Sequence, residues 1–160
     1  MRRFLLVASL AAFLPEASAQ PDSRSVFGER TPLLAAGADA IQAGRYDDGI
    51  RLTIEGLEKE TVSSRLKAAA LANLCAAHAA KGEADVAIGF CDESVELDPS
   101  NWRAYSNRSY AYWQKGLYAE ATADIDAAAR LAPDAPQIAA IRGLINEKTL
   151  LPRVTMENRQ

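Results

Sequence analysis

The chain repeats itself at a spacing of 34 residues. Nine residues of one segment recur with the same identity 34 positions later: Ala70, Asn73, Ala77, Lys81, Gly82, Ala87, Asp92, Leu97 and Pro99 return as Ala104, Asn107, Ala111, Lys115, Gly116, Ala121, Asp126, Leu131 and Pro133. A repeat of this length is typical of helical hairpins, which bury their apolar faces by stacking on copies of themselves. The spacing therefore predicts a curved helical array, and it favours binding along a groove over catalysis in a closed core.

Large and small residues follow one order in every copy. The last copy holds Tyr105, Arg108, Ser109, Tyr112, Ala121, Ile125, Ala128 and Pro133, and the middle copy holds Leu71, Leu74, Cys75, His78, Ala87, Cys91, Ser94 and Pro99. A first, weaker copy contains Gly37, Gly49, Thr53 and Gly56, and four extra residues separate it from the next. This order resembles the pattern of the tetratricopeptide repeat (TPR) family, from which the last copy departs at Arg108.

The resemblance implies an all-α fold, a right-handed superhelical stack of about three TPR helix hairpins followed by a C-terminal capping helix. The alanine-rich composition, without alternating runs of Val, Ile and Thr, also predicts helices. We expect repeats over about residues 30–63, 64–101 and 102–135, a capping helix over 136–148 and a tail over 149–160. The expected helix caps are Thr31, Ser63 or Ser64, and Asn101 at the starts, and Gly44, Gly82 and Gly116 at the ends of the first helices.

The first 19 residues have the three regions of a secretory signal peptide. Arg2 and Arg3 give a basic start, residues 4–14 form an apolar run, and Ala17-Ser18-Ala19 is a small-residue cleavage site. We expect cleavage after Ala19, a periplasmic or secreted product, and a flexible segment over residues 20–29. Because the apolar run is too short to span a bilayer, no stable membrane insertion is expected.

The composition also limits the kinds of partner. Cleavage leaves 16 of 18 basic and 20 of 21 acidic residues, a formal net charge of -4. Such a chain is a poor partner for nucleic acid. We predict no catalytic residue, metal site or cofactor, because the single histidine, His78, stands in an aromatic slot and the acidic pairs Asp47-Asp48 and Asp124-x-Asp126 are typical of solvated charge.

The two cysteines flank the turn of the middle hairpin. The midpoint between Cys75 and Cys91 is residue 83, next to Gly82, so an antiparallel hairpin places the two side chains opposite each other. An exported protein meets an oxidising compartment, and we therefore predict a disulfide. The alternative is a pair of buried thiols that act as small apolar fillers.

In TPR arrays the first helix of each hairpin lines the concave groove, so the resemblance implies a set of ligand-binding residues. These are Asn73, Arg103, Asn107, Tyr110, Trp113 and Gln114, whereas the first copy offers Leu34 and Ala38. Asn73 and Arg103 match part of the Lys, Asn and Arg set with which chaperone-binding TPRs grip a carboxylate, but the full two-carboxylate set is absent. The alternative for Tyr110 and Trp113 is packing against the neighbouring hairpin or the capping helix.

The resulting hypothesis is a non-enzymatic protein-protein interaction module in the periplasm, which binds a peptide segment or a partner protein in the groove. A second hypothesis is a structural subunit of a cell-envelope assembly that uses its convex face or its tails. A third, an enzyme or small-ligand carrier, requires a closed apolar pocket with converging polar groups.

Overall fold

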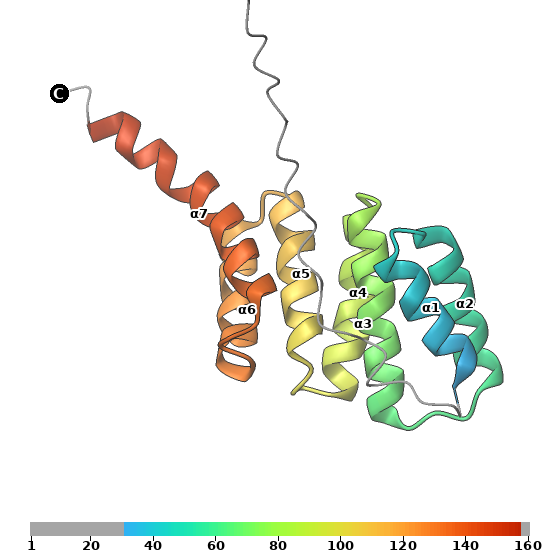
Figure 1. The fold of residues 1–160 in the computed structure, drawn as a ribbon. Coiled ribbons are helices and arrows are strands. Elements are labelled where there is room, and N and C mark those ends of the chain that lie inside the picture. The colour runs from blue at the N-terminus through green and yellow to red at the C-terminus, as the bar shows by residue number, and fades with distance from the viewer. Residues whose placement is uncertain (1–30, 158–160) are drawn as a thin grey trace, which may run out of the picture.

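The computed structural model describes residues 31–157, with side chains as far as residue 150; the predicted signal peptide (1–19) and the segment 20–29 lie outside these residues. The described chain forms seven α-helices and no strand, and Figure 1 shows how the helices are arranged. They are α1 (Pro32–Gln42), α2 (Tyr46–Lys59), α3 (Ser64–Ala80), α4 (Ala84–Leu97), α5 (Trp102–Gln114), α6 (Tyr118–Leu131) and α7 (Pro136–Glu157). The predicted all-α array of three hairpins and one further helix is confirmed.

A glycine turns the chain in each hairpin. Gly44, Gly82 and Gly116 have φ of 76°, 80° and 74°, the left-handed conformation that glycine adopts without a steric penalty. After the first of these glycines, the N–H of Arg45 donates to the Ala40 carbonyl at 2.9 Å, and the N–H of Gly44 donates to the Ile41 carbonyl at 3.0 Å. This pair of bonds satisfies carbonyls that the end of a helix leaves free.

The helix starts differ in part from the prediction. Ser63 caps α3, since its hydroxyl accepts a hydrogen bond from the N–H of Leu66 at 3.3 Å. The side chain of Thr31 does not cap α1. The carboxylate of Glu60, just after α2, instead accepts from the N–H groups of Leu33 at 2.7 Å and Leu34 at 3.3 Å. An anion at the start of a helix is favourable, so the end of the first hairpin stabilises its beginning.

The prediction that Asn101 caps α5 is wrong. Its side chain makes no capping bond, because the amide donates to the Ser94 hydroxyl at 3.1 Å and to the Ala68 carbonyl at 3.4 Å. Asn101 therefore ties the start of α5 to the two helices of the hairpin before it.

The last helix is longer than the predicted capping helix. α7 begins at Pro136, as expected, and continues to Glu157 through residues assigned to a tail from position 149. The predicted boundary at position 149 falls inside a stretch, residues 144–151, that contains no glycine or proline, and the Thr149 hydroxyl donates to the Ile145 carbonyl at 3.0 Å. The helix also continues past Pro152. The part that packs on α6 uses Ile138, Ile141 and Ile145.

The first helices of the hairpins lie closer together than the second helices. α1, α3, α5 and α7 contact one another in succession, whereas α2, α4 and α6 make no contact with one another within the described residues (Figure 1). An array whose units touch along one side curves toward that side. We therefore assign the concave face to α1, α3 and α5 and the convex face to α2, α4 and α6.

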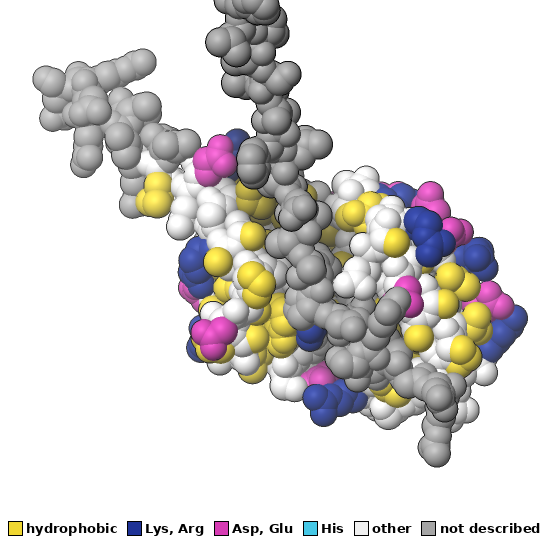
Figure 2. Space-filling view, viewed as in Figure 1, with side chains coloured by type: hydrophobic (Ala, Val, Ile, Leu, Met, Phe, Trp, Pro, Cys, Tyr) yellow, Lys and Arg dark blue, Asp and Glu magenta, His cyan; other side chains and the backbone are white. Residues whose placement is uncertain are grey.

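Ion pairs repeat along one edge of the array. Lys81, after α3, pairs with Asp47 of the preceding hairpin at 2.7 Å, and Lys115, after α5, pairs with Asp85 in the same way. Figure 2 shows charged side chains of both signs mixed along α2, where Arg51 and Lys59 pair with Glu55. Because these charges are exposed, each pair contributes only about 0–1 kcal/mol to stability.

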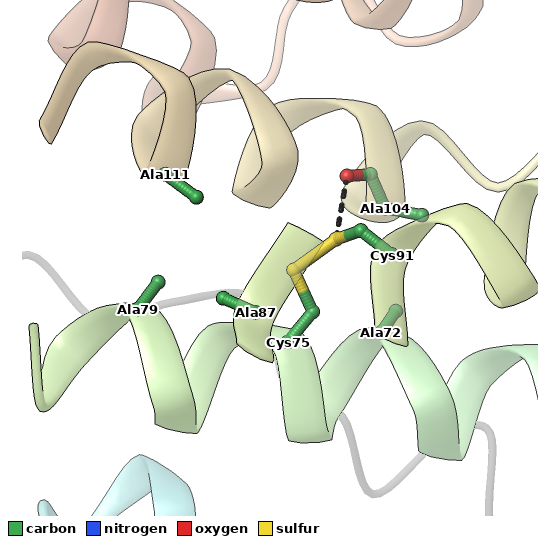
Figure 3. Close-up of a cluster of buried hydrophobic side chains, with 7 residues drawn as sticks. All are labelled: Ala72, Cys75, Ala79, Ala87, Cys91, Ala104 and Ala111. Atoms are coloured by element: carbon green, nitrogen blue, oxygen red, sulfur yellow. Dashed lines mark hydrogen bonds between the residues drawn. A yellow bond between two sulfur atoms is a disulfide. The ribbon is translucent and has the colours of Figure 1, made fainter. Parts of the chain in front are cut away.

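Cys75 and Cys91 form the predicted disulfide between α3 and α4. Their Cα atoms are 5.4 Å apart, both residues are fully buried, and the bond joins positions 16 residues apart. The Sγ of Cys91 lies 3.0 Å from the Ala104 carbonyl oxygen of α5 (Figure 3). A half-cystine carries no hydrogen, so this is a close sulfur–oxygen contact and not a donated bond.

Glycines allow the two helices of the first hairpin to touch. A Cβ added at Gly37 would collide with the Thr53 hydroxyl and would lie 3.0 Å from the Thr53 backbone nitrogen. A Cβ at Gly49 would lie 3.0 Å from the Gly37 carbonyl oxygen, and one at Gly56 would lie 2.7 Å from the Leu34 side chain. Neither backbone can move without separating α1 from α2.

We expect Gly37→Ala to destabilise the protein by about 1–3 kcal/mol, because the added methyl forces the two backbones apart. Gly89→Ala is the matched control, since Gly89 lies in α4 with no atom within 4 Å of the added Cβ. We expect this control to stabilise the protein by up to about 1 kcal/mol through helix propensity. Urea unfolding followed by circular dichroism measures both, and equal stabilities of the two variants would contradict the packing argument.

Candidate functional site

The concave face of the third hairpin holds most of the predicted binding residues. Asn73 lies half-buried on α3, and the other five lie on α5. Near Asn73, the α3 surface carries only the small side chains Ala76, half-buried, and Ala80, exposed. In the first hairpin, Leu34 and Ala38 were expected to face the groove. Both are instead buried in the core.

Arg103 is a half-buried cation at the start of α5. Its guanidinium carbon lies 4.4 Å from the centroid of the neighbouring Trp102 ring. Burial lowers the pKa of Arg103, since desolvation disfavours the charged form. No carboxylate in the described part of the chain pairs with this guanidinium. Among the described residues this guanidinium therefore has no anionic partner, and a guanidinium is a donor group that suits a carboxylate.

Asn107 and Gln114 link the helices of the concave face. The Asn107 amide donates to the Ala72 carbonyl at 3.0 Å, and the Gln114 amide donates to the Ala79 carbonyl at 2.9 Å. Both carbonyls belong to α3. The Asn107 oxygen also accepts from the amide of Gln137 on α7 at 2.9 Å. Sequence reasoning missed these partners because helix carbonyls on alanines leave no side-chain signal.

Gln114 is satisfied only in part. Its amide oxygen is buried and has no hydrogen-bond partner within the described chain, although its nitrogen is bonded to α3. Because its nitrogen is hydrogen-bonded to α3 and its oxygen is buried, Gln114 is part of the interface between α3 and α5. Whether it also contacts a ligand stays a prediction.

Tyr110 and Trp113 stack on each other and pack toward α7. Their ring centroids are 5.6 Å apart, and the indole N–H of Trp113 donates to the Leu144 carbonyl at 3.1 Å. Both rings pack against the cluster of buried isoleucines at the α6–α7 interface. Packing against the last helix, the alternative considered from the sequence, is the arrangement that Trp113 adopts. A ligand contact of either ring stays a prediction.

Arg108, the departure from the TPR pattern, is an ionic link on the other side of α5. Its guanidinium makes a two-bond contact with Asp124 on α6, at 2.6 and 2.8 Å, and a third bond to Asp92 on α4 at 2.6 Å. These bonds, that to Asp124 foremost, raise the pKa of Arg108. The expectation that Asp124 is solvated charge is wrong, since only 7% of it is exposed. The only sign in the sequence that Asp124 is buried was Arg108, which stands at a position where the repeat pattern has an apolar residue.

The single histidine, His78, packs within the second hairpin. The ring of His78 is half-buried and stacks on Phe90 at 5.3 Å, and its Nδ1 hydrogen-bonds the Glu83 carboxylate at 2.6 Å. That bond, followed by the one from Lys81, lowers the pKa of Glu83. Within the described residues no group of three His, Cys, Asp or Glu side chains could hold a metal ion.

A shallow, open hollow lies at the first turn, lined by Gly44, Arg45, Tyr46, Asp47, Asp48 and Lys81. None of the predicted groove residues lines it, and it lacks the apolar enclosure that a small-ligand carrier requires. None of the helices that the structure describes is both long and apolar enough to cross a membrane.

No protein-family model matches the chain, and no curated protein matches it by sequence. Solved structures do match. The Hsp90 co-chaperone Cns1 from Saccharomyces cerevisiae gives a TM-score of 0.70 at 22% identity, with 84% of this chain and 45% of that chain covered. The second TPR domain of human RPAP3, in complex with an HSP70 peptide, gives 0.58 at 21% identity, covering 72% and 96%. The Yersinia enterocolitica type III secretion translocator chaperone SycD gives 0.58 at 20% identity, covering 81% and 93%.

The chain thus spans less than half of the Cns1 chain but nearly all of the isolated RPAP3 domain. At these sequence identities the likeness establishes the architecture. The three hairpins, their glycine turns and the additional last helix give this protein the fold of a tetratricopeptide repeat domain.

Proposed function

We propose that this protein is a non-enzymatic interaction module of the periplasm that binds a peptide segment or a partner protein along the concave face of α1, α3 and α5. The observation that carries the proposal is the half-buried Arg103, which has an aromatic neighbour and no carboxylate partner in the described chain. A desolvated cation is unfavourable until an anion pairs with it. A carboxylate of the ligand would complete this site.

Similar TPR domains support a peptide as the ligand. Structures of this fold include complexes with peptides of HSP70 and HSP90. In this chain Asn73 lies on α3, next to the helix that carries Arg103, and the alanines beside it leave room for an extended backbone. A two-carboxylate grip is not proposed, because Asn107 is already bonded to α3 and α7 and the first hairpin offers buried apolar residues.

The convex face supports a second candidate, a structural subunit of a cell-envelope assembly. Ile54 on α2 and Val86 on α4 are 40% and 48% exposed, which is high for β-branched apolar side chains. A partner that covers them would bind without using Arg103. Crosslinks that form from position 86 and not from position 73 would favour this candidate.

The periplasmic part of the proposal rests on the signal-like N-terminus and on the disulfide, which suits an oxidising compartment. We expect the exported protein to begin at Gln20 and to be found in the periplasmic fraction. Intact-mass measurement of the fractionated protein tests this. Recovery from the cytoplasm alone with Met1 still present would contradict export.

Arg103→Gln should weaken capture of the ligand at least tenfold, since a charge-assisted bond to a carboxylate contributes about 1.5–3 kcal/mol. A photoreactive residue at position 73 identifies the bound segment in cells, and synthetic forms of that segment are then titrated by fluorescence anisotropy. Arg130→Gln is the matched control, because Arg130 is an exposed arginine of α6 on the convex side. Equal affinities of the two variants would contradict the site.

Trp113→Ala should lower the free energy of unfolding by about 3 kcal/mol or more, because it empties a packed position and removes the bond to Leu144. Trp113→Phe keeps most of the packing and should cost about 1 kcal/mol for the lost hydrogen bond. Thermal unfolding compares the two variants. A Trp113→Ala protein of unchanged stability that no longer binds the ligand would move Trp113 from the core to the binding site.

A further inference from the structure

Each hairpin has a pair of equivalent positions, one on each of its two helices, and the three hairpins carry different residues there. The pair is Gly37 and Thr53 in the first hairpin, Cys75 and Cys91 in the second, and Ser109 and Ile125 in the third, as the spacings of 38 and 34 residues require. In the first hairpin the pair is held by packing, and in the third the Ser109 hydroxyl also donates to the Ala121 carbonyl of α6 at 2.7 Å. The second hairpin alone among these three joins the two positions covalently.

The core around the disulfide is built from the smallest side chains. The other buried members of the cluster between α3, α4 and α5 are all alanines, namely Ala72, Ala79, Ala87, Ala104 and Ala111 (Figure 3). The corresponding cluster of the third hairpin and α7 contains Ile125, Ile138, Ile141 and Ile145. Larger side chains, the half-buried Ile88, Phe90 and Val95 of α4, pack against this cluster from outside. Since alanine buries little apolar surface, the fully buried part of the cluster contributes less to stability than the isoleucine cluster does.

The space left for the two sulfur atoms suits a bond. Bonded sulfur atoms are about 2.05 Å apart, whereas non-bonded heavy atoms separate to about 3.5–4.0 Å. The Cα atoms are 5.4 Å apart, and the Ala104 carbonyl oxygen already lies 3.0 Å from the Cys91 sulfur. Two thiols at these positions would overpack the interface of α3, α4 and α5.

We propose that oxidation of Cys75 and Cys91 is the step that closes the second hairpin, so that the array and its concave face assemble only under oxidising conditions. Cys75 and Cys91 lose two protons and two electrons as the S–S bond forms, and a disulfide-bearing oxidant is reduced to two thiols. The proposal concerns assembly and does not depend on which ligand the concave face binds.

Because the second hairpin lies between the other two, its closure by the disulfide affects the whole array. α3 contacts α1, α2 and α5, and α4 contacts α5. The carbonyls that accept the amides of Asn101, Asn107 and Gln114 also belong to α3. A second hairpin that does not close therefore separates the first hairpin from the third and removes the continuous concave face.

Burial of the bond makes the closed state resistant to reduction. Both cysteines are fully buried, so an oxidant acts before the helices close and a reductant acts only when they open. The rate of reduction of the folded protein by dithiothreitol should therefore reach a plateau as the dithiothreitol concentration rises.

The test compares oxidised and reduced wild-type protein by amide hydrogen exchange. The purified protein is reduced in denaturant and returned to buffer with or without glutathione disulfide. We expect the amides of α3 and α4 to exchange at least a hundredfold faster in the reduced protein, and glutathione disulfide to restore their protection. Reduced protein that keeps its protection within threefold of the oxidised level would overturn the proposal.

The third hairpin supplies a control variant. Cys75→Ser with Cys91→Ile places the Ser109 and Ile125 pair in the second hairpin, and it should show the same exchange with and without reductant. A variant that loses protection in reductant would overturn the proposal, because the effect would not come from the cysteine pair. The wild-type comparison decides the question even if this variant does not fold.

Discussion

The structure depends on the close approach of the two helices within each hairpin. Side chains at one pair of facing positions set that distance, and each hairpin meets the requirement with different chemistry. Gly37 admits the Thr53 side chain, Cys75 bonds to Cys91, and Ser109 donates its hydroxyl to the Ala121 carbonyl at 2.7 Å. A larger residue at the first position would separate the helices, and the stacking surface of the hairpin would change with them.

The hairpins are joined by polar side chains that reach across to helix carbonyls. The amides of Asn101, Asn107 and Gln114 fix α5 against α3, and Gln137 and Trp113 connect α5 with α7. Alanine-rich interfaces allow this, because short side chains expose the neighbouring carbonyls. The cost is that several polar groups of the concave face are occupied, so less of this face is available to a ligand than its composition suggests.

Much of the fold was predictable because the repeat itself encodes it. The 34-residue spacing gives the hairpins, the glycines give the turns, and the cysteine spacing about Gly82 gives the disulfide. The site was less predictable, because register places a residue on a face without naming its partner. Asn107 and Gln114 lie on α5 as expected, yet their partners are backbone atoms. Glu60 caps α1 from 27 residues away, which no local rule detects.

Two arginines of α5, five residues apart, show how the structure distinguishes a stabilising charge from an available one. Arg108 is surrounded by Asp92, Asp124 and the Tyr105 ring, and every charge in the group has a partner. Arg103 is similarly enclosed, but its described contact is the Trp102 ring. A ring gives a cation about 0.5–2 kcal/mol, less than the several kcal/mol that removing an ion from water costs. An arginine in this state gains more from an incoming carboxylate than an exposed arginine does, and this difference is the reason for proposing the start of α5 as the place where the concave face recognises a ligand.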